Sequence, residues 1–161
     1  VNDSENRYAN KRSWDFNVNE QGWRFHMSNV MAAIGRVQLN RFPVFKIKRQ
    51  TLAKRYMKRL EGIDALKYFN FNFDNVVPHI FVVRILDNQR DRIKEVLNDG
   101  GIQTGIHYKP NHLLDFYKSE CLLPKTEKCY SEILTLPLHP DLSITDIDFI
   151  CDTLINNLKK Y

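Results

Sequence analysis

The chain has 161 residues, of which 43% are hydrophobic and 27% are charged, and its formal net charge is +5. This composition is typical of a folded globular domain, and a chain of this length buries roughly 70% of the surface that it exposes when unfolded. No apolar run approaches the roughly 20 residues that span a bilayer, and the polar first residues contain no signal-peptide core, so we expect a cytoplasmic protein.

The first predicted helix begins near residue 28. Apolar residues recur at spacings of three and four from Met27 to Val37, and Ser28 has the short hydroxyl side chain of an N-cap. Pro43 is expected to interrupt the helical pattern or to occupy a first turn. Residues 46–60 then form a second, strongly basic helix that ends at Gly62. Its expected apolar face consists of Phe45, Leu52, Tyr56 and Leu60.

The rest of the chain alternates predicted strands and helices. Residues 65–75 form an edge strand or a packed loop, and residues 79–86 form a strand. Asp87 and Asn88 are good residues to start a helix over 90–99, two glycines end it, and a further strand covers 102–108. Residues 134–138 are a short strand, and Ser143 with Asp146 is a capping-box variant before a last helix. The stripe on that helix is Ile147, Ile150, Cys151, Leu154 and Leu158. The fold class is therefore α/β.

Several kinds of chemistry are disfavoured by the residues themselves. His107 and His112 are five positions apart with Pro110 between them, which does not fit the helical spacing of zinc ligands, so we expect no metal site. The sequence has no nucleophile elbow, phosphate-binding loop or dinucleotide fingerprint. The basic residues of 46–60 fit the polar face of an amphipathic helix, so we expect no nucleic-acid binding. Cys121, Cys129 and Cys151 are too far apart for a CxxC site and indicate reduced thiols.

Three segments together indicate a family. They are GWRFHMSNVMAAIGRVQLNRF (22–42), GIQTGIHYKPNHLLDFY (101–117) and LTLPLHPDLS (134–143). In this order they resemble the C-terminal part of the DegT/DnrJ/EryC1/StrS family, the pyridoxal-phosphate-dependent nucleotide-sugar aminotransferases. The first segment is similar, position by position, to the family pattern GYNYRMSNIQAAIGLAQLERL, and the resemblance extends from about residue 22 to the end.

The resemblance implies the small C-terminal α/β domain of a fold type I pyridoxal-phosphate-dependent transferase, with leading helices. Residues 1–43 would be an arm and connecting helix at the interface with a large domain, and residues 44–161 the small domain. Family members move an amino group from glutamate to a keto sugar on a nucleotide diphosphate, work as homodimers, and serve the synthesis of polysaccharides and antibiotic sugars. Their large domain supplies the lysine that forms a Schiff base with the cofactor. The surroundings of Lys11 do not match that motif, so we expect a fragment that is inactive alone.

The family's functional residues carry over at two places. The resemblance implies cofactor binding, across a dimer interface, by Arg24, His26, Ser28 and Asn29. Arg24 stands where the family usually has Asn or Lys, and His26 where it has Arg or Asn. In the family, the loop after the small-domain strand contacts the sugar nucleotide. The resemblance therefore implies that contact for His107, Tyr108, Lys109, His112 and Tyr117. Their ammonium, hydroxyl and imidazole groups suit a diphosphate and sugar hydroxyls.

Two other functions remain open at this stage. The chain could be a stand-alone module that binds a nucleotide sugar or a partner protein through the face of residues 27–42. It could also belong to a related pyridoxal- or pyridoxamine-phosphate-dependent sugar dehydratase. In the aminotransferase interpretation, a large domain or a dimer mate covers the apolar side chains of Met27, Val30, Met31 and Ile34.

Overall fold

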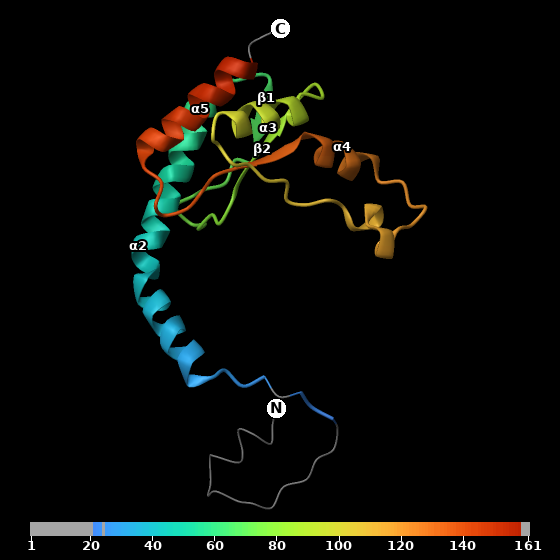
Figure 1. Ribbon diagram of the computed structural model, residues 1–161. Helices are drawn as coiled ribbons and strands as arrows, with labels where there is room; N and C mark the ends of the chain where they lie inside the picture. Colours follow the sequence, from blue (N-terminus) through green and yellow to red (C-terminus); the bar gives the residue numbers. More distant parts are fainter. Residues whose placement is uncertain (1–20, 24, 159–161) are drawn as a thin grey trace, which may run out of the picture. The chain divides into compact units, whose positions relative to one another are not determined.

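The computed structural model describes residues 21–23 and 25–158 (Figure 1). The chain divides into two compact units, Val1–Gln38 and Leu39–Tyr161. The division lies within the long helix α2, Asn29–Leu60, and the predicted domain boundary at residues 43 and 44 lies in the same helix. The functional roles assigned to those two domains stay predictions.

Helix α2 begins as the sequence predicts but is not interrupted at Pro43. Ser28 is its N-cap, because its Oγ accepts a hydrogen bond from the Met31 N–H at 3.3 Å. The expected break at Pro43 is wrong, since Pro43 lies inside a continuous helix. A proline removes one N–H donor and its ring crowds the carbonyl four residues earlier, which can kink a helix without ending it. Leu39, Arg41 and Lys46 beside Pro43 favour a helix, and the helix continues through it. Gly62, with φ of 73°, follows the end of the helix as predicted.

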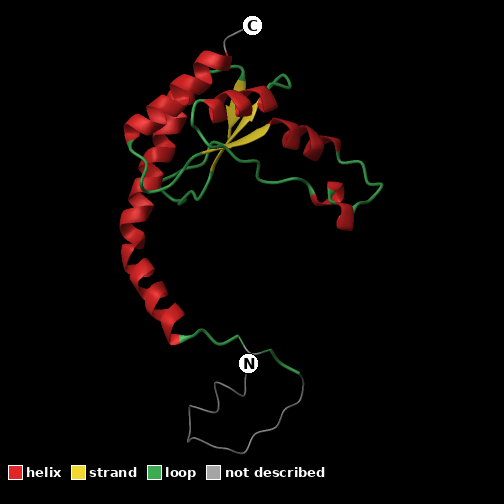
Figure 2. Ribbon diagram, viewed as in Figure 1, coloured by secondary structure: helices red, strands yellow, loops and turns green. Residues whose placement is uncertain are grey.

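The described strands form one three-stranded sheet in the order β1-β2-β3, with both pairs antiparallel. These strands are β1 Leu66–Tyr68, β2 Phe81–Ile85 and β3 Ile133–Leu136 (Figure 2). In the register, Val83 of β2 faces Tyr68 of β1 on one side and Leu134 of β3 on the other. The predicted strands near 79–86 and 134–138 are confirmed, and the aromatic segment contributes an edge strand.

The predicted strand over residues 102–108 is wrong. Its pairing is limited, within the described residues, to an isolated bridge between Gly105 and Thr135 of β3. A glycine weakens a strand, and Pro110 has no N–H to donate, so this sequence cannot sustain a longer ladder. The segment leaves the sheet edge after Gly105 and leads into two short 3-10 helices, η1 and η2.

Three further helices pack around or beside the sheet. They are α3 Arg90–Asp99, α4 Pro124–Glu132 and α5 Ile144–Leu158. Asp87 and Asn88 do not start α3 as predicted. Both have φ of 57° in a tight turn, a conformation that short Asp and Asn side chains tolerate, and Gln89 takes the N-cap position. The predicted capping box of α5 is confirmed, because the Asp146 N–H donates to Ser143 Oγ at 3.1 Å and the Ser143 N–H donates to Asp146 Oδ2 at 2.8 Å.

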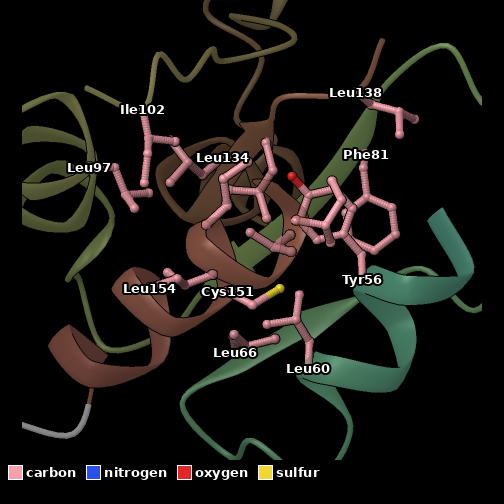
Figure 3. Close-up of a cluster of buried hydrophobic side chains, with 14 of the residues drawn as sticks. Tyr56, Leu60, Leu66, Phe81, Leu97, Ile102, Leu134, Leu138, Cys151 and Leu154 are labelled. Atoms are coloured by element: carbon pink, nitrogen blue, oxygen red, sulfur yellow. The ribbon is translucent and has the colours of Figure 1, made fainter. Parts of the chain in front are cut away.

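The core lies between α2, the sheet and α5 (Figure 3). The Tyr56 ring stacks on Phe81 with ring centres 4.6 Å apart, and its hydroxyl donates to the Pro137 carbonyl at 2.9 Å. The predicted stripe of α5 is confirmed as buried, at Ile147, Ile150, Cys151, Leu154 and Leu158. On α2 the buried residues are Leu52, Ala53, Tyr56 and Leu60, while Phe45 is half-buried. Within the described residues, no helix has the length and apolar character needed to cross a membrane.

Candidate functional site

The candidate substrate segment starts at the outer edge of β3. The Gly105 N–H donates to the Thr135 carbonyl at 3.1 Å, and the Thr135 N–H donates to the Gly105 carbonyl at 2.7 Å. These two bonds fix the start of the segment on the sheet. The residues that follow Gly105 therefore leave from a defined point and direction.

The His107 ring is held against β3 by a hydrogen bond of its Nδ1 atom. Its Nδ1 lies 2.9 Å from Thr135 Oγ1. The ring also fills the space beside Gly105, because a Cβ added at residue 105 would lie 2.7 Å from His107 Cε1. His107 therefore packs on β3, and its Nε2 atom is the ring nitrogen that remains for a ligand.

Tyr108 and Lys109 are presented to solvent. The Tyr108 side chain is 73% exposed, with its ring edge-on to His107 at a centre distance of 4.8 Å. Lys109 is exposed as well. A phenol hydroxyl and an ammonium group thus stand on consecutive residues, directly after His107, which is bonded to β3.

His112 belongs to η1, Asn111–Leu113, and faces α4. Its Nε2 lies 3.0 Å from Glu127 Oε1, and its side chain is only 10% exposed. The hydrogen bond from His112, together with one from the Leu123 N–H, lowers the pKa of Glu127 below its ordinary value. Glu127 is absent from the predicted site, because it lies 15 positions along the chain and no spacing pattern links it to His112.

The second short helix, η2 Asp115–Tyr117, carries the last predicted substrate residue. Tyr117 is 59% exposed, and its ring meets that of Phe116 edge-on at a centre distance of 5.0 Å. Figure 2 shows η1 and η2 on a segment that extends from the sheet to α4, and residues 106–123 are called the binding arm from here on. The structure therefore brings the five predicted substrate residues onto one arm, with both histidines bonded to the protein and the other three side chains exposed.

The predicted cofactor residues lie at the start of α2, in the other unit. Ser28 is the N-cap and Asn29 the first residue of the helix, and His26 is exposed in the segment before it. Arg24 lies outside the described residues. The first turn of α2 carries no acidic residue. Because unpaired N–H groups at a helix N-terminus favour anions, this end of α2 fits a phosphate group such as that of pyridoxal phosphate.

The described residues contain no group of three or more metal-ligating side chains. The five predicted substrate residues supply one ammonium, two phenols and two imidazoles. Such groups bind and orient anionic or hydroxylated ligands.

Comparison with known proteins identifies relatives with the same fold. The model of the DegT/DnrJ/EryC1/StrS aminotransferase family matches residues 2–155. The crystal structure of the aminotransferase TlmJ from Streptoalloteichus hindustanus is 33% identical, with a TM-score of 0.75 over 90% of this chain and 40% of that chain. A DegT DnrJ EryC1 StrS aminotransferase from Brucella abortus is 29% identical, with a TM-score of 0.67 over 81% of this chain and 36% of that chain.

A third relative is described with a form of its cofactor. Spr1654 from Streptococcus pneumoniae, described as a sugar aminotransferase and solved in its PMP-form, is 27% identical, with a TM-score of 0.80 over 92% of this chain and 39% of that chain. The chain thus spans about 40% of the length of these relatives. Its mixed helices and sheet match part of a fold type I, pyridoxal-phosphate-dependent sugar aminotransferase, as the resemblance implied. The chain belongs to the DegT/DnrJ/EryC1/StrS aminotransferase family.

Proposed function

We propose that this chain is the substrate-side part of an aminotransferase that moves an amino group from glutamate to a keto sugar carried on a nucleotide diphosphate. The family match over residues 2–155 carries the proposal. The chain spans about 40% of the length of its solved relatives, which supports the view that further chain completes the enzyme. We propose that the completed enzyme acts in the cytoplasm, in polysaccharide biosynthesis.

The arm would bind the nucleotide sugar. Lys109 is exposed and would pair with the diphosphate, which accepts charge-assisted hydrogen bonds from an ammonium group. Tyr108 and Tyr117 are also exposed and would stack on a ring or donate to sugar hydroxyls. His107 and His112 would add contacts through their second ring nitrogens, Nε2 and Nδ1 respectively, since Nδ1 of His107 and Nε2 of His112 bond to Thr135 and Glu127.

The start of α2 would hold the cofactor phosphate. Ser28 and Asn29 contribute the helix N-terminus, and Arg24 and His26 would add donors from the preceding segment. Pyridoxal phosphate, when bound, supplies the electron sink that allows an amino group to move between carbon skeletons. The lysine that holds this cofactor covalently would come from outside this chain.

Attachment of the cofactor can be tested directly. The chain is incubated with pyridoxal phosphate, reduced with borohydride, and digested for peptide mass spectrometry. We expect scattered, substoichiometric labelling of surface lysines. Stoichiometric labelling of a single lysine would show that this chain holds the cofactor itself and would overturn its assignment as the substrate-side part.

An exposed apolar face supports a homodimer or contact with the large domain. Met27 is 72% exposed, and Val30, Met31 and Ile34 are exposed on the same part of α2. Exposed patches of this kind mark interfaces. We expect the chain to self-associate in light scattering, and Met31→Lys to reduce association. Leu122→Lys, which changes an exposed leucine on the arm, is the matched control. A wild-type chain that stays monomeric at high concentration would contradict this interface.

Substrate binding is tested with uridine and thymidine diphosphates in calorimetric titrations. Lys109→Ala should weaken binding by roughly ten- to a hundredfold, because a charge-assisted hydrogen bond contributes about 1.5–3 kcal/mol. Lys67→Ala, on the exposed side of β1, is the control and should bind like the wild type. Equal affinities for Lys109→Ala and wild type, or no binding by the wild type, would refute the role of the arm.

A further inference from the structure

We propose that Glu127, on α4, is a positioning residue that holds the arm in the conformation that binds the nucleotide sugar. This inference rests on the proposed function, since it concerns the same arm. It adds a residue that neither the sequence patterns nor the resemblance indicates. Its basis is the arrangement of hydrogen bonds at a single carboxylate oxygen.

Glu127 Oε1 accepts hydrogen bonds from both ends of the segment 112–123. His112 Nε2 lies 3.0 Å from this oxygen, and the backbone nitrogen of Leu123 lies 3.2 Å from it. The Glu127 N–H in turn donates to the Leu123 carbonyl at 2.9 Å. One side chain therefore closes residues 112–123 into a loop whose two ends meet at α4.

The other hydrogen bonds of this loop do not attach it to the domain. In the part of the chain that the structure describes, the remaining hydrogen bonds of residues 111–122 are local turns. They run from Leu113 N to Pro110 O, from Leu114 N to Asn111 O, and from Tyr117 N to Leu114 O. These bonds shape η1 and η2 but do not attach them to α4 or to the sheet. Among the described residues, the hydrogen bonds to Glu127 connect this segment to α4.

The start of α4 explains why a hydrogen-bond acceptor at residue 127 matters. Leu123 is the N-cap of α4, and its aliphatic side chain has no atom that accepts a hydrogen bond, so it makes no capping bond. Pro124 follows at the first turn. Glu127 reaches back to the Leu123 N–H, and its charge suits the positive end of the helix. Because a carboxylate only accepts, His112 must carry its proton on Nε2.

The consequence for binding is a smaller entropy loss. A flexible loop of this length would have to be ordered when the ligand binds, and side-chain and loop ordering weakens affinity. With its two ends held at Glu127, the loop presents Tyr117 from a limited set of conformations. Lys109 lies between this anchor and the attachment of His107 to Thr135, so it is restrained on both sides.

The test compares wild type with Glu127→Ala, Glu127→Gln and the control Glu95→Ala. Glu95 is an exposed glutamate on α3. Glu95→Ala therefore removes the same charge from a helix as Glu127→Ala does. Hydrogen exchange is measured over residues 108–123, and uridine or thymidine diphosphate binding by calorimetry. Thermal unfolding of each variant shows whether the domain remains folded.

In Glu127→Ala we expect amide exchange of Leu123 and the loop to rise by roughly tenfold, while amides of β2 stay protected. Affinity for the nucleoside diphosphate should fall by roughly three- to tenfold. Glu127→Gln keeps an acceptor oxygen, so it should restore much of the protection and of the affinity. Glu95→Ala should match the wild type in both measurements.

The failures of this proposal and of the proposed function can be told apart. If the wild type binds the diphosphate and Glu127→Ala binds it equally well, Glu127 is not a positioning residue, whatever the exchange rates. Unchanged exchange of the loop in Glu127→Ala has the same consequence. If the wild type binds no nucleoside diphosphate, the proposed function of the arm fails, and the role given to Glu127 in binding fails with it.

Discussion

Arg55 and Asp148 are joined by two parallel hydrogen bonds, Nε to Oδ1 and Nη2 to Oδ2, each 2.7 Å long. The pair connects α2 to α5, which lie side by side over the core (Figure 1). The bonds from Arg55 lower the pKa of Asp148 below its ordinary value. Paired carboxylates of this kind make stability depend on pH.

Asp148→Asn should lower the melting temperature by a few degrees at neutral pH, because it removes the charge that Arg55 binds. The folded pKa of Asp148 is depressed, so its contribution is present above the unfolded pKa and is lost as pH falls through the folded pKa. The difference from wild type should therefore shrink in acid. Thermal unfolding at a series of pH values measures it, with Asp99→Asn, at the exposed end of α3, as control. A pH-independent difference would contradict the assignment.

Gly105→Ala should destabilise the domain by about 1–3 kcal/mol, as overpacking does. The new Cβ would lie 2.7 Å from His107 Cε1, so the ring must move and lose its bond to Thr135. Urea unfolding gives the stability. The control is Gly35→Ala in α2, where a Cβ would meet no atom within 4 Å. That variant should be stabilised by roughly 0.5–1 kcal/mol, because Ala favours a helix over Gly. Equal stability of Gly105→Ala and wild type would show that the His107 ring is not fixed.

Tyr56→Phe should cost about 1–2 kcal/mol, because it leaves the Pro137 carbonyl without its hydrogen bond. Burial raises the pKa of Tyr56 well above its ordinary value, so its hydroxyl remains a donor across the working pH range. Urea unfolding measures the loss. The matched control is Tyr68→Phe, since the half-buried Tyr68 ring also approaches Phe81, at 6.4 Å, and should lose little stability. Similar losses in the two variants would argue against a specific role for the hydroxyl.

The three cysteines should differ strongly in reactivity. Burial raises the pKa of the Cys151 thiol to about 12, so little reactive thiolate forms near neutral pH. Cys121 is exposed and Cys129 is half-buried. In the folded chain, Ellman's reagent should modify Cys121 first, and Cys151 only at the rate of unfolding. Cys121→Ser should remove the fast phase, and a fast phase that survives this change would show that another thiol is accessible.

Local and periodic features of the fold were predictable from the sequence. The spacing of apolar residues on α5 identified five buried positions, because the helical repeat is a property of neighbouring residues. The same holds for Ser28 and for the pair Ser143 and Asp146, whose capping bonds join residues three positions apart. Such contacts depend on the local chain alone.

Features that depend on distant contacts were predicted less well. The strand expected over 102–108 needs a partner along its whole length, and β3 offers Gly105 a single bridge. At the candidate site, the segment carrying the histidines could be identified, but their partners Thr135 and Glu127 lie 28 and 15 positions away. No periodicity connects residues at such separations.

The bridge at Gly105 also covers the outer edge of β3. The outer edge of β3 presents the backbone groups of Ile133 and Thr135, and each of these four groups is bonded in the described structure. Gly105 takes both groups of Thr135, Arg90 Nη1 donates to the Ile133 carbonyl at 3.2 Å, and the Ile133 N–H donates to Cys129 O. An open edge is a template for intermolecular strand addition and amyloid-like aggregation. The segment that leads to the candidate binding arm therefore also closes this edge, so β3 offers no open backbone groups on which a strand of a second copy could polymerise.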